Sequence, residues 1–86
     1  MRIYMQTRPT PEHSPRFYHL FLQEDLIGGW TLVRETGQQG GSGKVSRQHF
    51  EDWDSALESM LSWRDKQIER GYHVVFVQGQ TATGKS

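Results

Sequence analysis

Apolar and polar side chains alternate along several short stretches in the first part of the chain. In RIYMQT, residues 2–7, Ile3 and Met5 fall on one face, which is the period-2 pattern of a β-strand. The run RFYHLFLQED is rich in aromatic residues and compatible with a strand on both faces, which is typical of a central strand. Similar patterns follow in WTLVRE and VSRQHF. The predicted strands therefore cover residues 2–7, 16–25, 30–35 and 45–50.

Glycine and proline mark the connections between these strands. The stretch RPTPEHSP contains three prolines, which remove backbone donors and predict a loop. Leu26 to Gly29 contain two glycines and predict a tight connection, so that the second and third strands pair as a hairpin. The stretch TGQQGGSGK has four glycines in nine residues, a composition that predicts an open loop because it cannot pack.

The period of the apolar positions changes to that of a helix after the fourth predicted strand. Ser55 and Glu58 form an S-x-x-E capping box, and Asp52 and Asp54 add negative charge where the helix dipole favours it. Gly71 can adopt the left-handed conformation that ends a helix. The helix is therefore predicted to end near residue 70, and its apolar stripe consists of Ala56, Leu57, Met60, Leu61, Trp63 and Ile68.

A last strand pattern, Tyr72 to Val77, completes an order of four strands, one helix and one strand. This order predicts an α+β fold, because a single amphipathic helix buries its stripe by packing on one face of an antiparallel sheet of about five strands. We expect residues 1–78 to form one domain and residues 79–86 to be a disordered tail. The side chains expected between helix and sheet are Trp30, Leu32, Ala56, Leu57, Met60, Leu61 and Trp63.

The amino-acid composition argues against several kinds of binding partner and of cofactor site. Ten basic residues balance ten acidic ones, which argues against a dominant electrostatic partner such as bulk nucleic acid or an anionic membrane. There is no cysteine, and the four histidines lack the spacing of metal ligands, so we expect neither a metal nor another cofactor. No apolar run has the length of a signal peptide or a membrane span. These features predict a cytoplasmic monomer.

The sequence ends in GQTATGKS, in which Gly79, Gly84, Lys85 and Ser86 match the spacing of a phosphate-binding P-loop. A P-loop works together with a following helix, whose N-terminus faces the phosphates. No helix follows Ser86 in this sequence. We therefore interpret the match as a chance occurrence in a polar tail, and the start of a truncated NTPase is the less favoured alternative.

An ordered set of residues within positions 16–73 matches the pattern of a known family. They are Trp30, Arg34, Gly37, Gly40, Gly43, Ala56, Lys66, Gly71 and Tyr72. This ordered set resembles the WGR domain, an α+β module found in some poly(ADP-ribose) polymerases and as short free-standing bacterial proteins. The resemblance implies the same fold as the hydrophobic pattern does.

The triplet that gives this family its name reads Thr36-Gly37-Gln38 in the present sequence. In the polymerase members the Trp and Arg of the triplet contact DNA near a strand break, so the resemblance implies nucleic-acid binding. Only the glycine carries over. Gln38 can donate hydrogen bonds but cannot supply a charged bidentate fork to phosphate, and Thr36 offers no ring for stacking.

Residues 36–50 contain Lys44, Arg47 and His49 and no acidic residue, which together with Arg34 predicts a local positive surface. Lys44 and Arg47 are three positions apart and point to opposite faces in a strand. So few cations give only weak, salt-sensitive binding, and an ordinary solvated loop is the alternative reading. The predicted contacts to DNA or RNA are Arg34, Gly37, Gln38, Lys44 and Arg47.

No arrangement of residues indicates catalysis. No serine lies in a nucleophile turn beside a candidate base, and helix capping accounts for the acidic cluster Glu51, Asp52 and Asp54. We therefore expect a non-enzymatic binding domain whose ligand is nucleic acid. A protein–protein interaction module, docking through the sheet or the helix, is the alternative that the neutral net charge favours.

Overall fold

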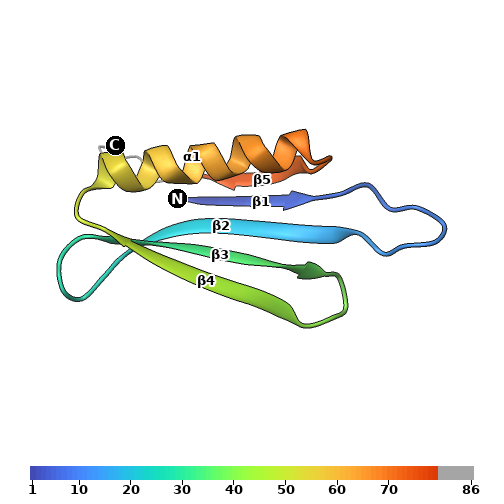
Figure 1. Cartoon of the computed structure of the whole chain (residues 1–86), viewed down its shortest axis with the longest axis horizontal. Coiled ribbons are helices and arrows are strands. Elements are labelled where there is room, and N and C mark those ends of the chain that lie inside the picture. The colour runs from blue at the N-terminus through green and yellow to red at the C-terminus, as the bar shows by residue number, and fades with distance from the viewer. Residues whose placement is uncertain (80–86) are drawn as a thin grey trace.

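The computed structural model describes residues 1–79 and contains five strands and one helix in that part of the chain. The strands form one antiparallel sheet in the order β4-β3-β2-β1-β5, and the helix lies along the sheet (Figure 1). The predicted α+β fold is therefore confirmed. The elements are β1 (Arg2–Gln6), β2 (Arg16–Glu24), β3 (Trp30–Gln38), β4 (Gly43–Phe50), α1 (Trp53–Glu69) and β5 (His73–Gln78).

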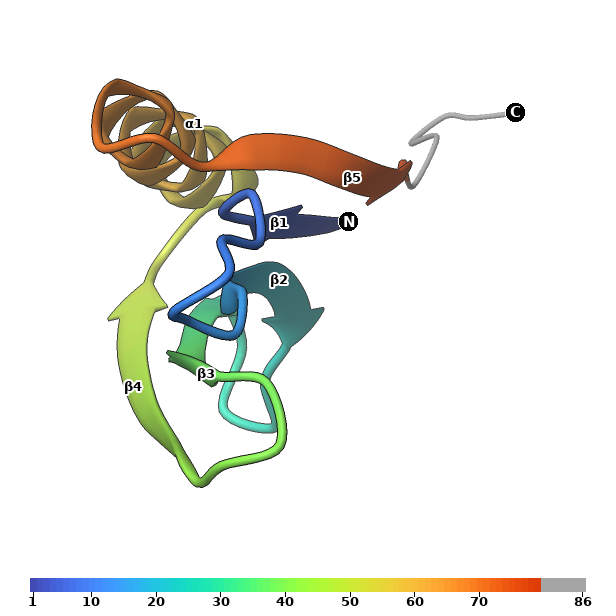
Figure 2. The same cartoon turned by 90° about the vertical axis from the view of Figure 1, so that its right-hand side faces the viewer.

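The sheet consists of a meander and an added edge. Strands β2, β3 and β4 follow one another through short connections and pair in sequence order. The helix then carries the chain from the β4 edge to the opposite edge of the sheet, where β5 pairs with β1. Figure 2 looks along the strands and shows α1 on one side of the sheet only. In residues 1–79, no helix is long and apolar enough to cross a membrane.

The two faces of the sheet can be followed through the pairing register. Leu20 lies opposite Ile3 on β1 and Arg34 on β3, and these three side chains share the face that α1 covers. We call it the helix-covered face. Phe21 lies opposite Arg2 and Val33, and the face that carries Phe21 is called the open face. Alternate residues of every strand belong to alternate faces.

The hydrophobic core lies between α1 and the helix-covered face. Its buried members from the sheet are Ile3, Met5, Tyr18, Leu20, Leu22 and Leu32, and those from the helix are Ala56 and Met60. Leu32, Ala56 and Met60 were predicted and are confirmed. Trp30, Leu57, Leu61 and Trp63 are only half-buried at the margin of this core, because one helix covers the centre of a five-stranded sheet and leaves the flanks of its own stripe in contact with solvent.

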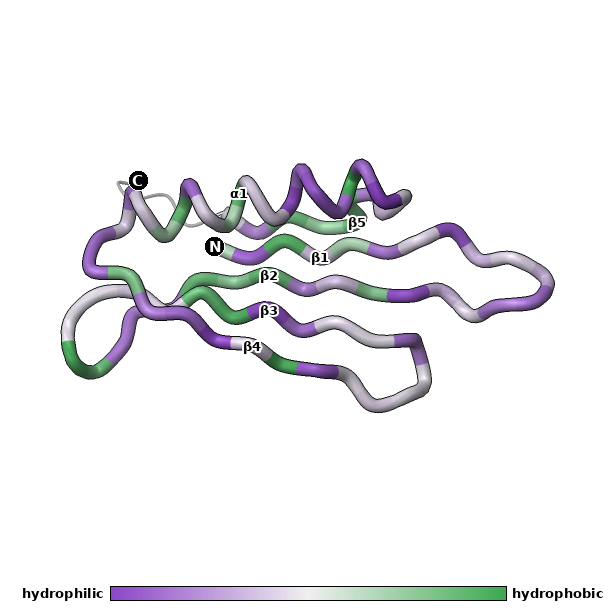
Figure 3. Tube along the Cα trace, in the orientation of Figure 1, coloured by the Kyte–Doolittle hydropathy of each residue, from purple (hydrophilic) through white to green (hydrophobic). Residues whose placement is uncertain are grey.

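The stripe of α1 differs from the prediction at its C-terminal end. Gln67 is 1% exposed and Ile68 is 47% exposed, so Ile68 is not part of the buried stripe. Gln67 lies seven residues after Met60 and therefore returns to the same side of the helix, whereas Ile68 is rotated away. Figure 3 shows that hydrophilic positions dominate this half of α1.

The helix begins three residues earlier than the capping box predicts. Asp52 is the N-cap, and its carboxylate accepts hydrogen bonds from the backbone N–H of Ser55 at 2.9 Å and from the Ser55 hydroxyl at 3.0 Å. These bonds lower the pKa of Asp52. The Ser55–Glu58 capping box was therefore wrong, because Ser55 donates to a cap rather than acting as one. Gly71 ends the helix with φ of 101°, as predicted.

The glycine-rich stretch does not form an open loop. Strand β3 extends to Gln38 and β4 starts at Gly43, so only residues 39–42 make the turn. Gly37 and Gly43 lie directly opposite each other in the ladder. A Cβ atom on Gly37 would lie 2.9 Å from the Cα of Gly43 and 3.2 Å from the ring of Phe17. The glycines therefore allow close packing here, which the composition argument excluded.

Candidate nucleic-acid interface

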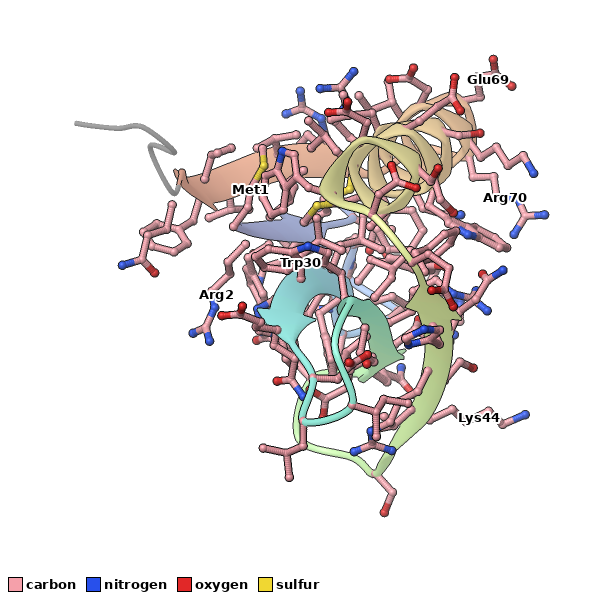
Figure 4. The ribbon with its side chains drawn as sticks, turned by 90° about the vertical axis from the view of Figure 1, so that its left-hand side faces the viewer. Met1, Arg2, Trp30, Lys44, Glu69 and Arg70 are labelled. Carbon is pink, nitrogen blue, oxygen red and sulfur yellow. The ribbon has the colours of Figure 1, made fainter. Side chains whose placement is uncertain are left out.

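The predicted contact residues lie on two different faces of the sheet. Thr36 pairs with Lys44 and Val33 pairs with Arg47, so Lys44 is on the helix-covered face and Arg47 is on the open face. Arg34 and Gln38 have the same parity as Thr36 and lie on the side of Lys44. In Figure 4 Lys44 points to the side of the sheet that carries α1. The structure therefore brings Arg34, Gln38 and Lys44 onto one face and separates Arg47 from them.

Gly37, the fifth predicted contact, is buried in the β3–β4 ladder. Its close approach to Gly43 and to the ring of Phe17 gives it a packing role. Thr36 beside it donates its hydroxyl to the carbonyl oxygen of Phe17 at 3.1 Å. The first two positions of the triplet thus serve the fold, and Gln38 is the one of the three whose side chain is exposed.

Arg34 is held in place by aromatic side chains. Its guanidinium carbon lies 3.9 Å from the ring centroid of Trp63, and its Nη1 donates to the hydroxyl of Tyr18 at 3.3 Å. Lys66 approaches the same indole, with its Nζ 4.8 Å from the ring centroid. Tyr72 packs edge-on against Tyr18 at 5.7 Å. A guanidinium that stacks on a ring can still donate in its own plane, so Arg34 is positioned to contact an anion.

Trp63 and Lys66 were absent from the predicted contacts. Their spacing of three residues on the predicted helix was the available signal, because side chains at i and i+3 share a helix face. We call Arg34, Gln38, Lys44 and Lys66 the helix-side patch. Its three cations form no ion pair within residues 1–79. The residues of β3 and β4 that share this face near them are Thr36 and Ser46, which carry no charge.

His49 does not contribute to a positive surface. Its Nδ1 lies 2.7 Å from a carboxylate oxygen of Asp25, and its Nε2 lies 3.3 Å from one of Glu51. The same Asp25 oxygen accepts a hydrogen bond from the hydroxyl of Thr31 at 3.1 Å. The hydrogen bond to Asp25 is the main cause that raises the pKa of His49. Glu51 therefore contacts His49 and does not cap α1, contrary to the prediction.

Metal binding at this corner has no support from the geometry. Both ring nitrogens of His49 already face carboxylates, and residues 1–79 contain no group of three or more potential ligands placed to hold a metal ion. Of the P-loop pattern only Gly79 is described, so Gly84, Lys85 and Ser86 lie outside the described residues.

The chain matches the model of a known protein family. The family model described as WGR domain matches residues 1–78, which include every strand and the helix. No curated protein and no solved structure matches the chain.

Proposed function

The chain belongs to the WGR domain family, and from this membership we propose that it is a non-enzymatic domain that binds nucleic acid, DNA or RNA, through the helix-side patch. The family resemblance supports the class of ligand. The two positions at which polymerase members carry the contacting Trp and Arg are Thr36 and Gln38 here, and both lie on the helix-covered face.

The observation that carries the proposal is the stacked guanidinium of Arg34. Trp63 holds it at 3.9 Å, and Lys66 lies on the same ring. Lys44 lies on the neighbouring strand, opposite Thr36 and therefore one same-face position along from the partner of Arg34. These three cations have no carboxylate partner within residues 1–79 and can contact successive phosphates, which position a duplex without reading its sequence.

The patch lacks the stacking ring and the charged fork of the family triplet. Binding should therefore be weak and strongly dependent on salt. Three phosphate contacts give a slope of about −2.7 for log K against log salt concentration on a duplex. A neutral chain with one such patch fits this regime better than tight binding.

The test measures the fluorescence anisotropy of a labelled blunt-ended duplex at low salt. Lys44→Glu is expected to abolish binding, because it removes one phosphate contact and adds a repelling charge. Arg47→Glu is the matched control: it makes the same change of charge on the same strand but on the open face, and it should leave duplex binding unchanged.

A gain of function provides the complementary test. The double variant Thr36→Trp with Gln38→Arg restores a stacking ring and a bidentate fork to the helix-covered face, so end-binding should strengthen. The proposal fails if neither the natural chain nor this variant binds a duplex at low salt. It also fails if Arg47→Glu weakens binding as much as Lys44→Glu does.

A protein-interaction module is the second candidate, and the edge strand β5 favours it. Its outer edge has no pairing partner within residues 1–79, and Val75, Phe76 and Val77 are about half exposed. Such an edge can accept a strand of another protein. This function predicts that Val75→Lys abolishes co-purification of a partner, whereas Lys44→Glu leaves it intact.

A further inference from the structure

We propose a second ligand site, on the open face of the sheet, where the bases of single-stranded nucleic acid stack on aromatic rings. This site lies on the opposite side of the sheet from the helix-side patch and does not depend on it. It would add a second class of nucleic acid to the ligands of the domain.

The first observation is a row of side chains that crosses the whole sheet. Arg2 pairs with Gln78 on β5 and with Phe21 on β2, and Phe21 pairs in turn with Val33, which pairs with Arg47 on β4. These five side chains share the open face, and Figure 4 shows Arg2 pointing away from the side of Lys44. The row places a guanidinium on each side of an aromatic ring and an aliphatic side chain.

The second observation is a set of aromatic rings next to this row. His19 lies 5.0 Å from Phe21 and 5.7 Å from Tyr4, and Tyr4 stacks on Phe17 at 6.1 Å with an interplanar angle of 15°. Phe76, opposite Tyr4 on β5, is 49% exposed. Neighbouring rings on a sheet face that no helix covers are the feature on which single-stranded bases stack, whatever their sequence.

The third observation is a pocket of about 310 Å³ at the end of this face. Four of the side chains that line it belong to the open face, namely Arg2, Phe21, Gln23 and Gln78. Phe21 supplies a ring for stacking, and the two amides carry both donors and acceptors, as the edges of nucleobases do. The guanidinium of Arg2 lies over the Phe21 ring, with its carbon 5.4 Å from the ring centroid, and from the rim of the pocket it can donate to the phosphate of a bound nucleotide.

The charges on the open face favour a polyanion over an apolar partner. Each carboxylate on this face lies beside a histidine: Glu35 is 3.9 Å from His19, and Asp25 and Glu51 contact His49. Arg2 and Arg47 form no ion pair within residues 1–79. An apolar protein surface would bury these guanidinium groups without anionic partners, which is unfavourable.

The test measures the anisotropy of labelled oligothymidylate with the intact chain at low salt. Phe21→Leu removes the stacking ring and should weaken binding roughly 5- to 160-fold. Arg2→Gln replaces an exposed side chain, so the fold is retained, and it should reduce the salt slope by about 0.7. Arg47→Glu should weaken binding of the single strand, while Lys44→Glu should leave it unchanged. In NMR spectra, the side-chain amide signals of Gln23 and Gln78 should shift.

The proposal is overturned if the natural chain does not bind oligothymidylate at low salt, or if Arg2→Gln and Phe21→Leu bind it as the natural chain does. It is also overturned if sedimentation shows a dimer that Arg2→Gln dissociates and that oligothymidylate does not affect, because a second copy then occupies the open face. The two sites can be judged separately by duplex binding. If duplex binding is lost in Lys44→Glu but kept in Phe21→Leu, the helix-side patch is supported even when the open-face site fails.

Discussion

The two faces of the sheet differ in what covers their apolar side chains. On the helix-covered face, Leu20 and Leu32 are completely buried, as is Met60 of α1, which packs in the same core. On the open face the rings of Tyr4 and Phe21 are only half-buried, and their neighbours on the same face provide the cover. One face therefore provides most of the stability of the fold, and the other keeps large side chains available for a ligand.

The largest expected effect tests this difference directly. Met60→Ala removes a fully buried side chain on the sheet-facing side of α1 and should lower the free energy of unfolding by about 2–5 kcal/mol. Phe76→Ala truncates a larger side chain that is 49% exposed on the open face, and should lower it by about 1 kcal/mol or less. Urea unfolding of both variants measures the two values. Equal losses would show that the open face contributes to stability as the core does.

A smaller effect is expected where the open face is tightly packed. Gly37→Ala places a Cβ 2.9 Å from the Cα of Gly43, which is backbone and cannot move away, so the free energy of unfolding should fall by about 1–3 kcal/mol. Gly41→Ala is the control, because its Cβ would meet only the carbonyl oxygen of Gln38 at 3.4 Å. Thermal unfolding of both variants measures the difference, and a neutral Gly37→Ala would contradict the close packing of β3 and β4.

The two faces also carry a matched pair of cation–π contacts. Arg34 lies 3.9 Å from the Trp63 ring beside α1, and Arg2 lies 5.4 Å from the Phe21 ring on the open face. Arg34→Gln should lower the free energy of unfolding by about 1 kcal/mol and change the tryptophan fluorescence. Arg2→Gln should lower the free energy of unfolding by about 0.5 kcal/mol or less, because its cation–π contact is longer and more exposed. A larger loss in Arg2→Gln would reverse the comparison.

The smallest effects concern two histidines of the open face whose pKa values shift in opposite directions. Hydrogen bonding to Asp25 raises the pKa of His49. The protonated His49 therefore contributes fully to the free energy of unfolding below about pH 6.5, and this contribution is lost as the pH rises through the raised pKa. Burial lowers the pKa of His19, so stability is lost as the pH falls from about 6.5 towards the lowered pKa.

Melting temperatures across this pH range check both shifts. His49→Gln should flatten the loss on the alkaline side, and His19→Gln should flatten the loss on the acidic side. The opposite assignment would contradict the burial of His19 and the hydrogen bond of His49 to Asp25 as the main causes of the two pKa shifts.

The parts of the fold that were predictable are those that depend on local patterns. Alternating apolar and polar side chains located β1, the aromatic-rich run located β2, the strand pattern of residues 72–77 located β5, and Gly71 located the end of α1. The start of α1 was not determined in this way, because Asp52 and Ser55 are both favoured capping residues and only the three-dimensional contacts show which one accepts the hydrogen bonds. The β3–β4 hairpin was misjudged for a related reason, since glycine permits both open loops and close strand packing.

The candidate site was also predictable from the sequence only where local patterns determine it. Strand parity alone predicted that Lys44 and Arg47 face opposite ways, as the pairing register shows. The stack of Arg34 on Trp63 depends on how α1 crosses the sheet, and the contact of His49 with Asp25 joins residues 24 positions apart. Such contacts follow from the packing of distant elements, which no local period in the sequence specifies.

The pairing of β1 with β5 has a consequence for the order in which the chain folds. Strands β2, β3 and β4 are joined by short turns, so their ladders close small loops, whereas Arg2 pairs with Gln78 across almost the whole described chain. Closing such a large loop carries the greater entropic cost, and we expect the meander to form first and β5 to join late. The pocket beside Arg2 and Gln78 is thus assembled in the final step of folding, and rupture of the β1–β5 edge during local opening would remove it before the core is lost.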